Sequence, residues 1–405
     1  MIDFIEMRLF VLDEFVISDR DGKHFLLSCD LLQLGVTVGS RDVYLDEQGN
    51  MQVGALYHPY DDLPTSFTNV AFKLVHEGKI KPHVMIKCSP AKIMQGHNIF
   101  GSDNLELGVF EMLGFLAESH PKLYKILDIP NAQIVNLDVT YSVRLRNDDQ
   151  VCKVLDFLRK VSSGSLRKSK LVYGSTVYWG SPNSKRLCRK AYCKSIEFQL
   201  QLAKLKRQAS KGEVFALRVI KAMEDPRVIE FMQGLLRLET RFKPLWLTEH
   251  NIPLNVFDLI KYQSEHPNFL TDLWQLANKP LFEALEGHTM KALDHDTVFG
   301  KICAKFDTYT KSGRLSQTKS RNIFNFFCAL ELHGSDELKK KYSKSQYYQY
   351  ISDLMSCGFS KAYLQNLDSE SKNNVIPFVQ LVKIDFQNQV PDWYQEPESR
   401  FAKVG

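Results

Sequence analysis

The stretch Ile134–Leu145, which reads IVNLDVTYSVRL, is the clearest β-strand pattern in the chain. Apolar side chains and Tyr141 take every second position, and polar side chains, Asp138 among them, take the positions between. Because successive side chains of a strand point to opposite faces of a sheet, this segment has an apolar back and a polar front. It therefore predicts a sheet with one apolar and one polar face.

A second segment, residues 235–243 (LLRLETRFK), repeats the alternation and carries Glu239 on its polar face. Two such strands side by side would place Asp138 and Glu239 in one shallow basin. Carboxylates on a rigid sheet are hard oxygen ligands that suit Mg²⁺ or Mn²⁺. The alternative is a pair of half-exposed strands whose charges only face solvent.

The rest of the chain predicts an α+β fold. Residues 1–90 alternate like strands, as in 70–75 and 83–87, with turn-rich pieces between them. Helical spacing of apolar residues appears at 104–118, 148–161, 213–233, 254–263, 321–332 and 345–355. We expect a larger region, residues 1–289, built on an antiparallel sheet with flanking helices. A smaller, mainly helical domain is expected at residues 290–405.

The most basic part of the chain is Val161–Lys211. It contains twelve lysines or arginines and one acid, Glu197, although the whole chain has a net charge of only +5. Such a surplus predicts a polyanionic partner, most commonly a nucleic acid. Tyr192 lies within it, flanked by Lys190 and Lys194, where a hydroxyl that attacks a phosphodiester would be useful. The alternative is a solvated basic loop followed by a surface helix.

Composition narrows the class of protein. An apolar share of 44% and a charged share of 24% are ordinary for a soluble globular chain, and 405 residues suffice for two or three domains. The first residues lack a signal-peptide pattern, and no apolar run is long enough to span a bilayer. None of the eight cysteines forms a Cys-x-x-Cys pair, so we expect reduced thiols in a cytoplasm and no zinc knuckle or disulfide framework.

Residues 89–101 combine a proline, two glycines and several polar side chains. We interpret them as a loop suited to gripping phosphate or an unpaired base through Lys92, Asn98 and backbone amides. His97 in the same loop is a candidate metal ligand or acid–base group. The alternative is a loop with a structural role only.

A dozen short segments stand in fixed order along the chain. They include His58-Pro59 with Asp62-Leu-Pro64, Lys87–Gly101, Leu137-Asp-Val-Thr140, Ala191-Tyr-Cys-Lys194 with Glu197, Gly234–Arg241 and Val390–Pro397. With these segments the chain resembles, from end to end, the gene II replication initiator family of filamentous bacteriophages. A weaker similarity, over 178–194 and 237–239, relates it to plasmid rolling-circle initiators of the trans-acting type.

The resemblance implies an enzyme that nicks one strand of the replicative duplex at the phage origin. The nick leaves a 3′-OH for rolling-circle synthesis, and the displaced strand is later reclosed into a circle. Tyr192 is implied as the nucleophile, forming a 5′-phosphotyrosyl link. Because a tyrosine pKa is near 10, we expect Lys190, Lys194 and a bound cation to favour the phenolate. On an extended strand, Lys194 would share the face of Tyr192 and touch the phosphate; the alternative is an ordinary surface lysine.

The histidines depart from the pattern of most rolling-circle endonucleases, which bind metal through a His-hydrophobe-His strand. No two of the eleven histidines here are two residues apart. We therefore expect Mg²⁺ or Mn²⁺ to be held mainly by carboxylates. The candidate ligands are Asp138 and Glu239, with Glu197 and His97 in addition.

The expected partners are the double-stranded origin and the displaced single strand. The resemblance adds host helicase and polymerase, oligomerisation on the DNA, and the cytoplasm of a bacterial host. The candidate DNA contacts are Lys92, Asn98, Arg167, Lys168, Lys170, Lys185, Arg186, Arg189, Lys190, Arg237 and Arg241. The resembling proteins also have an internal start at the position of Met290, which gives a gene X product. Residues 290–405 are thus expected to fold alone and to bind DNA without nicking it.

Two other classes of protein fit part of the pattern. A non-catalytic origin- or single-strand-binding protein needs the basic patches but neither Tyr192 nor the carboxylates. A metal-dependent hydrolytic nuclease would cleave DNA without leaving a protein–DNA adduct.

Overall fold

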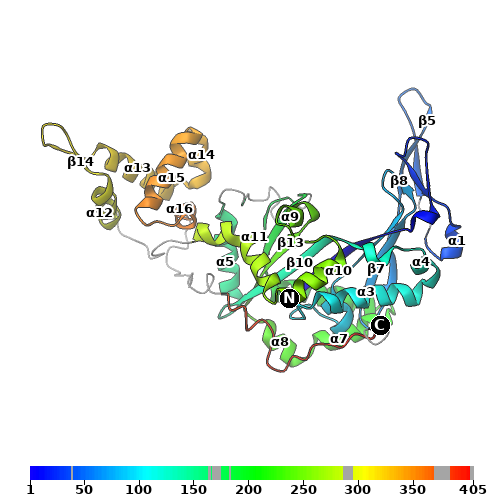
Figure 1. The fold of residues 1–405 in the computed structure, drawn as a ribbon. Helices are drawn as coiled ribbons and strands as arrows, with labels where there is room; N and C mark the ends of the chain where they lie inside the picture. Colours follow the sequence, from blue (N-terminus) through cyan, green and yellow to red (C-terminus); the bar gives the residue numbers. More distant parts are fainter. Residues whose placement is uncertain are drawn as a thin grey trace.

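The computed structural model of the protein describes residues 1–37, 40–162, 166, 175–181, 184–285, 295–368 and 384–401. At its centre is an eight-stranded sheet in which all neighbouring strands are antiparallel (Figure 1). The strand order is β11 (Thr176–Trp179), β12 (Leu187–Cys193), β13 (Leu235–Phe242), β10 (Gln133–Arg144), β1 (Ile2–Phe10), β9 (His83–Cys88), β7 (Asn69–Val75) and β6 (Asp61–Pro64). The predicted α+β fold is confirmed.

The two strands predicted most clearly from the sequence, β10 and β13, are neighbours in the sheet. Thr140 pairs with Glu239 and Asp138 pairs with Arg241, so both carboxylates point to the same face. A glycine makes the turn into β13 possible, because Gly234 has φ +68° and a Cβ there would lie 2.2 Å from the Leu145 carbonyl oxygen.

Helices cover the apolar face of the sheet and form the main core with it. They are α3 (Leu105–Ser119), α4 (Pro121–Lys125), α5 (Asp148–Lys160), α9 (Pro244–Glu249), α10 (Val256–Glu265) and α11 (Phe269–Leu285). Asn104 begins α3 and Asn147 begins α5, each with a side chain that accepts a hydrogen bond from a first-turn amide. The helices predicted at 104–118, 148–161 and 254–263 therefore form close to the expected bounds.

A second apolar cluster joins Phe100 to three further helices, α6 (Lys194–Ala209), α7 (Val214–Met223) and α8 (Pro226–Met232). The sequence predicted one helix at 213–233, and the chain breaks it at Asp225-Pro226. Proline cannot donate the backbone hydrogen bond that would continue α7, and Asp225 caps the new helix by accepting from Arg227 N at 2.9 Å. The segment expected as a loop, 89–101, also contains a short helix, α2 (Pro90–Gln95).

The C-terminal helices form a small domain with its own core (Figure 1, left). They are α12 (His295–Phe306), α13 (Thr318–His333), α14 (Ser335–Lys341), α15 (Lys344–Ser356) and α16 (Lys361–Gln365), and a short hairpin, β14 (Thr308–Tyr309) and β15 (Leu315–Ser316), stands between α12 and α13. The end of this domain contacts α5, where Lys160 pairs with Asp368 at 2.9 Å. The expected domain start, Met290, lies outside the described residues.

Smaller elements extend the other end of the molecule. They are α1 (Leu31–Leu34), the three-stranded sheet of β2 (Val16–Ser18), β3 (Phe25–Leu27) and β8 (Glu77–Gly78), the hairpin of β4 (Ser40–Leu45) and β5 (Met51–Tyr57), and two 3-10 turns at Asp13–Phe15 and Ile129–Asn131. All eight cysteines are free. Within the described residues, no helix is both long enough and apolar enough to cross a membrane.

The C-terminal tail, residues 384–401, returns to the larger region and runs along it (Figure 1, red). The Gln389 side chain bonds to both backbone groups of Ser142, at 2.7 and 3.1 Å, at a part of β10 beyond the end of β1. Further on, Phe401 packs against Phe115, and its ring occupies space that any side chain at Gly114 would fill. A fragment of residues 290–405 would thus carry a tail without the surface on which it packs.

Candidate active site

Tyr192 and Glu239 face each other on neighbouring strands of the polar face. Strand pairing sets Lys190 opposite Glu239 and Tyr192 opposite Arg237. The Tyr192 hydroxyl donates a hydrogen bond to Glu239 Oε2 at 3.2 Å, and Lys190 Nζ lies 2.7 Å from Glu239 Oε1. Tyr192 and Glu239 are buried, whereas the Lys190 side chain is 30% exposed. A tyrosine hydroxyl, a proton acceptor and a cation therefore meet just below the surface.

The electrostatics of this pair differ from the sequence-based expectation. Burial, and then the charge of Glu239, raises the pKa of Tyr192 well above its ordinary value. Burial, and then the Asp3 carboxylate, raises the pKa of Glu239 to about 8, against the opposing effect of Lys190. The shift of the Tyr192 pKa is therefore opposite to the direction expected from Lys190, Lys194 and a bound cation. The resting site holds a protonated phenol next to a carboxyl group of unusually high basicity.

Lys194 does not lie on the strand with Tyr192, because β12 ends at Cys193 and Lys194 begins α6. Its side chain is 1% exposed, with Nζ 2.8 Å from Asn98 Oδ1 and 2.6 Å from Glu197 Oε2. Burial lowers the pKa of Lys194 to about 8, although Glu197 opposes this effect. The predicted Lys194–phosphate contact is therefore corrected: Lys194 holds the 97–101 loop and the start of α6 together.

Arg237 supports the same loop from the sheet. Its guanidinium donates hydrogen bonds to the carbonyl oxygens of Asn98 and Ile99, and the side chain is 1% exposed. Asp3, from β1, accepts a hydrogen bond from Asn98 Nδ2 at 2.7 Å and lies 3.8 Å from Arg237 Nη1. Asp3 was not predicted from the sequence, although its charge acts on both Tyr192 and Glu239.

Asp138, the other predicted metal ligand, binds Arg241. The guanidinium contacts both carboxylate oxygens at 2.7 Å, in a bidentate pair. Glu239 is likewise bound to Lys190 and Tyr192. Across the described residues, no three His, Cys, Asp or Glu side chains converge as metal ligands do. The donor atoms have the right chemistry for Mg²⁺, but in this arrangement their partners are Arg241, Lys190 and Tyr192. The alternative of half-exposed strands whose charges only face solvent is wrong, because both carboxylates are buried.

The two additional ligand candidates are also engaged elsewhere. Burial, and then the charge of Lys194, lowers the pKa of His97 to about 4, so the ring is neutral. It lies against Phe100 and within 3.3 Å of Gln95 Nε2. Glu197 is the partner of Lys194. Neither side chain is brought to Asp138 or Glu239 as a ligand of a common ion.

Three of the candidate DNA contacts are buried and are withdrawn as contacts in this conformation. Arg189 points to the opposite face of the sheet and donates two hydrogen bonds to the Ala277 carbonyl, at 2.8 and 2.5 Å. Asn98 and Arg237 form the loop support described above. The sequence placed Arg237 on an alternating strand and Arg189 in a basic stretch, but it could not tell which partners cover their side chains.

Of the remaining candidates, Lys190 and Arg241 pair with Glu239 and Asp138 as described above, and the others are surface or undescribed positions. Lys185 is exposed, Arg186 pairs with Glu249 at 2.5 Å, and Lys92 Nζ lies 3.1 Å from Gln201 Oε1. Arg167, Lys168 and Lys170 lie outside the described residues.

Beside the tyrosine site, the polar face continues as a half-exposed basic surface. Register places Asp138 level with Phe4, and Glu6 level with Lys87. On the same face, Lys73 and Lys87 lie over the ring of Tyr60, at 4.8 and 3.5 Å from its centroid. The sequence showed these lysines on strands but gave no sign that β7 and β9 join the same face as Tyr192. Basic side chains interleaved with aromatic rings suit the binding of a nucleic-acid strand.

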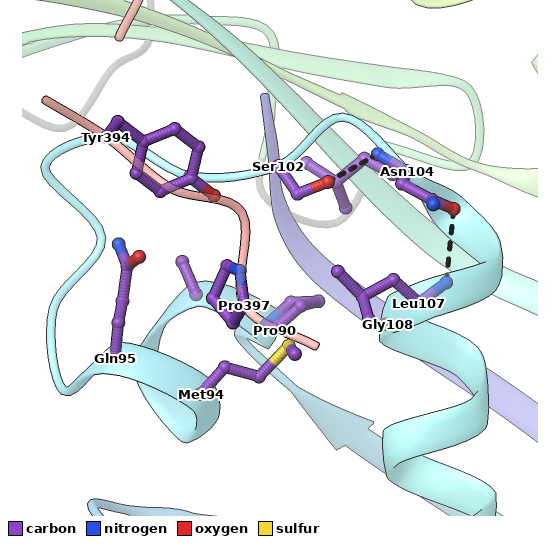
Figure 2. Close-up of a pocket in the computed structure, with 12 residues that line it drawn as sticks. Pro90, Met94, Gln95, Ser102, Asn104, Leu107, Gly108, Tyr394 and Pro397 are labelled. Carbon is purple, nitrogen blue, oxygen red and sulfur yellow. Dashed lines mark hydrogen bonds between the residues drawn. The ribbon is translucent and has the colours of Figure 1, made fainter. Parts of the chain in front are cut away.

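The C-terminal tail supports the 97–101 loop from outside (Figure 2). Trp393 and Tyr394 pack edge-on against Phe100, with ring centroids 5.2 and 5.4 Å away. Tyr394 and Pro397 line a small pocket with residues of α2 and α3. This loop carries Asn98, the partner of Lys194. The tail therefore stabilises the surroundings of Tyr192 without contacting Tyr192 itself.

We expect Tyr394→Ala to lower the free energy of unfolding by about 2 kcal/mol, since a half-buried ring is lost from Phe100. Tyr394→Phe should be as stable as the parent or slightly more so. The Tyr394 hydroxyl is buried without a hydrogen-bond partner among the described residues, so its removal costs nothing. Thermal unfolding followed by circular dichroism measures both variants. A marked loss of stability in Tyr394→Phe would mean that the hydroxyl has a partner.

Comparison with known proteins covers almost the whole chain. The family model for the N-terminal region of the phage replication-associated protein matches residues 1–267, and the model for the C-terminal region of the same protein matches residues 309–400. The chain is 35% identical to the replication-associated protein of Enterobacteria phage M13, over 99% of this chain and 100% of that protein. It is 33% identical to the protein of the same name of Salmonella phage IKe, over 100% and 98%. No solved structure matches.

Proposed function

Because this chain belongs to the phage replication-associated protein family, we propose that it is a rolling-circle initiator whose nucleophile is Tyr192. In this proposal it binds the origin, nicks one strand of the replicative duplex, and later recloses the displaced single strand into a circle. The observation that carries the proposal is the hydrogen bond from the Tyr192 hydroxyl to Glu239, next to the half-buried cation Lys190.

In the proposed nicking step, Tyr192 Oη attacks the phosphorus atom and its proton passes to Glu239. A 5′-phosphotyrosyl bond forms, the bond from phosphorus to the 3′ oxygen breaks, and that oxygen takes a proton from water. A carboxyl group with a pKa of about 8 is a far better acceptor for a phenol proton than an ordinary carboxylate. Lys190 and Arg241 are the cations on the same face that would stabilise charge on the phosphate.

Closure is the reverse reaction with a different strand end. A free 3′-OH attacks the phosphorus atom of the phosphotyrosyl ester and gives its proton to water. The bond from phosphorus to the Tyr192 oxygen breaks, and Glu239 returns its proton to that oxygen. The ester bond conserves the energy of the broken phosphodiester, so no nucleotide cofactor is needed for rejoining. The same two side chains thus serve both directions.

The experiment that tests this function is incubation of the protein with a supercoiled plasmid carrying the phage origin. Relaxation, together with a covalent adduct at the 5′ end that maps to the peptide containing Tyr192, supports the proposal. A band shift without relaxation indicates a non-catalytic binding protein, and cleavage without an adduct indicates a hydrolytic nuclease.

We also propose that Mg²⁺ or Mn²⁺ takes part, as the sequence suggests. Asp138 is the carboxylate left for this role once Glu239 is assigned to proton transfer, and it would have to exchange Arg241 for the ion. A bound divalent ion would neutralise charge on the scissile phosphate.

Asp138→Asn tests the metal directly. We expect about 10- to 100-fold weaker Mn²⁺ binding, measured by electron paramagnetic resonance on the protein with origin DNA, and cleavage that needs correspondingly more metal. Glu249→Gln is the matched control, since its carboxylate binds Arg186 outside the site. Unchanged Mn²⁺ affinity in Asp138→Asn would remove Asp138 as a ligand. If Glu239→Gln weakens Mn²⁺ binding instead, Glu239 is the ligand.

We propose the origin duplex and the displaced single strand as substrates, host helicase and polymerase as partners, oligomerisation on the DNA, and the bacterial cytoplasm as the location. The half-exposed lysines Lys73 and Lys87, beside Tyr60, extend the proposed DNA-binding surface away from Tyr192.

A further inference from the structure

The β14–β15 hairpin projects from the helical domain (Figure 1). Its two strands pair Tyr309 with Leu315, so both side chains share a face. Tyr309 is 75% exposed and Leu315 is 47% exposed. An aromatic ring left open to solvent on so small an element has no part in the core of its own domain.

The hairpin is held in one conformation. At its tip, Gly313 N donates to Thr310 O and Thr310 N donates to Arg314 O, both at 2.9 Å, and Gly313 has φ +78°. This is the arrangement of a tight hairpin turn that requires glycine. At its base, the Asp307 carboxylate accepts hydrogen bonds from Gln317 Nε2 at 3.0 Å and Ser320 Oγ at 2.5 Å. The hydrogen bonds of Asp307 and the tight turn hold the hairpin in place, so little conformational freedom of the backbone around Tyr309 is lost when a ligand binds.

The charged side chains that follow Asp307 in this part of the chain are all basic. Residues 308–321 contain four basic residues and no acid. Lys319 lies over the ring of Phe306 and 3.9 Å from Asp353 Oδ2, whereas Lys311, Arg314 and Arg321 pair with no acidic side chain among the described residues. The lysines of α14 contrast with them, since Lys339 and Lys340 pair with acids three residues earlier, at 2.9 and 2.8 Å.

We propose that this hairpin is a second DNA-binding site, which holds single-stranded DNA by stacking an unpaired base on Tyr309 and binding phosphates at Lys311 and Arg314. An exposed ring between free cations is the arrangement by which proteins bind single strands without reading sequence. Stacking on Tyr309 should favour single-stranded DNA over duplex, because the ring can stack on the face of a base only where that base is unpaired and unstacked from its neighbours. The inference rests on the proposed function only in taking DNA as the polyanion.

The test measures binding by the full-length chain carrying Tyr192→Phe, which prevents turnover. The probe is a fluorescein-labelled single-stranded oligonucleotide of about 20 residues without origin sequence, long enough to cover one such site. Tyr309→Ala should weaken binding about tenfold, whereas Tyr309→Phe, which keeps the stacking face, should bind like the parent. Lys311→Ala with Arg314→Ala should lower the slope of log affinity against log salt by about 1.4.

Lys339→Ala with Lys340→Ala is the matched control, because it removes the same charge from the same domain at paired positions. The proposal is overturned if this control loses as much affinity as the hairpin variant, or if Tyr309→Ala binds the oligonucleotide like the parent. The proposal is also overturned if Tyr309→Ala loses affinity for the duplex form of the probe but keeps its affinity for the single strand. The side chains of Tyr309, Lys311, Arg314 and Lys340 are exposed and that of Lys339 is half-buried. An unchanged thermal unfolding curve shows that each variant folds. A failure of Tyr192 to form an adduct would refute the proposed nicking chemistry and leave this result standing.

Discussion

Replacing Tyr192 by Phe is expected to lower the nicking rate by about 10⁴-fold or more while leaving DNA affinity unchanged. Removal of the nucleophile from a covalent mechanism abolishes the step that forms the intermediate. The substitution removes one oxygen atom, and its hydrogen-bond partner Glu239 keeps its ion pair with Lys190 at 2.7 Å. Fold and surface charge therefore persist. The readouts are relaxation of the supercoiled origin plasmid, the covalent 5′ adduct, and a band shift with the same DNA.

Tyr178→Phe is the matched control for this prediction. Tyr178 lies on β11 opposite Lys190, so it shares the polar face with Tyr192 and is more exposed. We expect the Tyr178 variant to nick at close to the parental rate. An adduct that persists in Tyr192→Phe and disappears in Tyr178→Phe would move the nucleophile to the edge strand.

Local pattern was enough to predict the two central strands β10 and β13 and three of the helices that cover the sheet, α3, α5 and α10. The alternation in 134–145 and 235–243 gave β10 and β13, because each face of these strands meets a different environment. The cap residue Asn104 marked the start of α3. The break between α7 and α8 was missed, since apolar spacing continues across Asp225-Pro226 and outweighed the proline in the prediction.

The site depended on non-local pairing, which the sequence pattern does not carry. β1 inserts next to β10 although they are separated by more than a hundred residues, and this brings Asp3 to the tyrosine site. The switch from strand to helix at Cys193 changed the role of Lys194, because period-2 counting placed it beside Tyr192. The burial that raises the pKa of Glu239 arises from tertiary packing. Residue identity could therefore suggest members of the candidate site, whereas their contacts and burial depend on the fold.

Glu239→Gln is expected to lower the nicking rate by about 10²- to 10⁴-fold, the range that a positioned general base contributes. Glutamine keeps the shape of the side chain and can still bond to the Tyr192 hydroxyl, but it cannot accept the proton. The parent should show a nicking rate that rises with pH and levels off above a midpoint near 8. Only the ionised carboxylate is a base, and burial together with Asp3 holds the Glu239 pKa at about 8. The variant should lose this rise.

Lys190→Gln separates proton transfer from metal binding at Glu239. The Lys190 ammonium stabilises the Glu239 carboxylate, so its removal should raise the Glu239 pKa further and move the midpoint of the pH–rate profile to higher pH. If Glu239 were instead a metal ligand, excess Mn²⁺ should restore the nicking rate of Glu239→Gln. A profile that keeps its midpoint near 8 in Glu239→Gln would show that another group accepts the proton. The combination expected here is a flat profile in Glu239→Gln, a displaced one in Lys190→Gln, and no recovery with Mn²⁺, because the lost function is the acceptance of the Tyr192 proton at 3.2 Å.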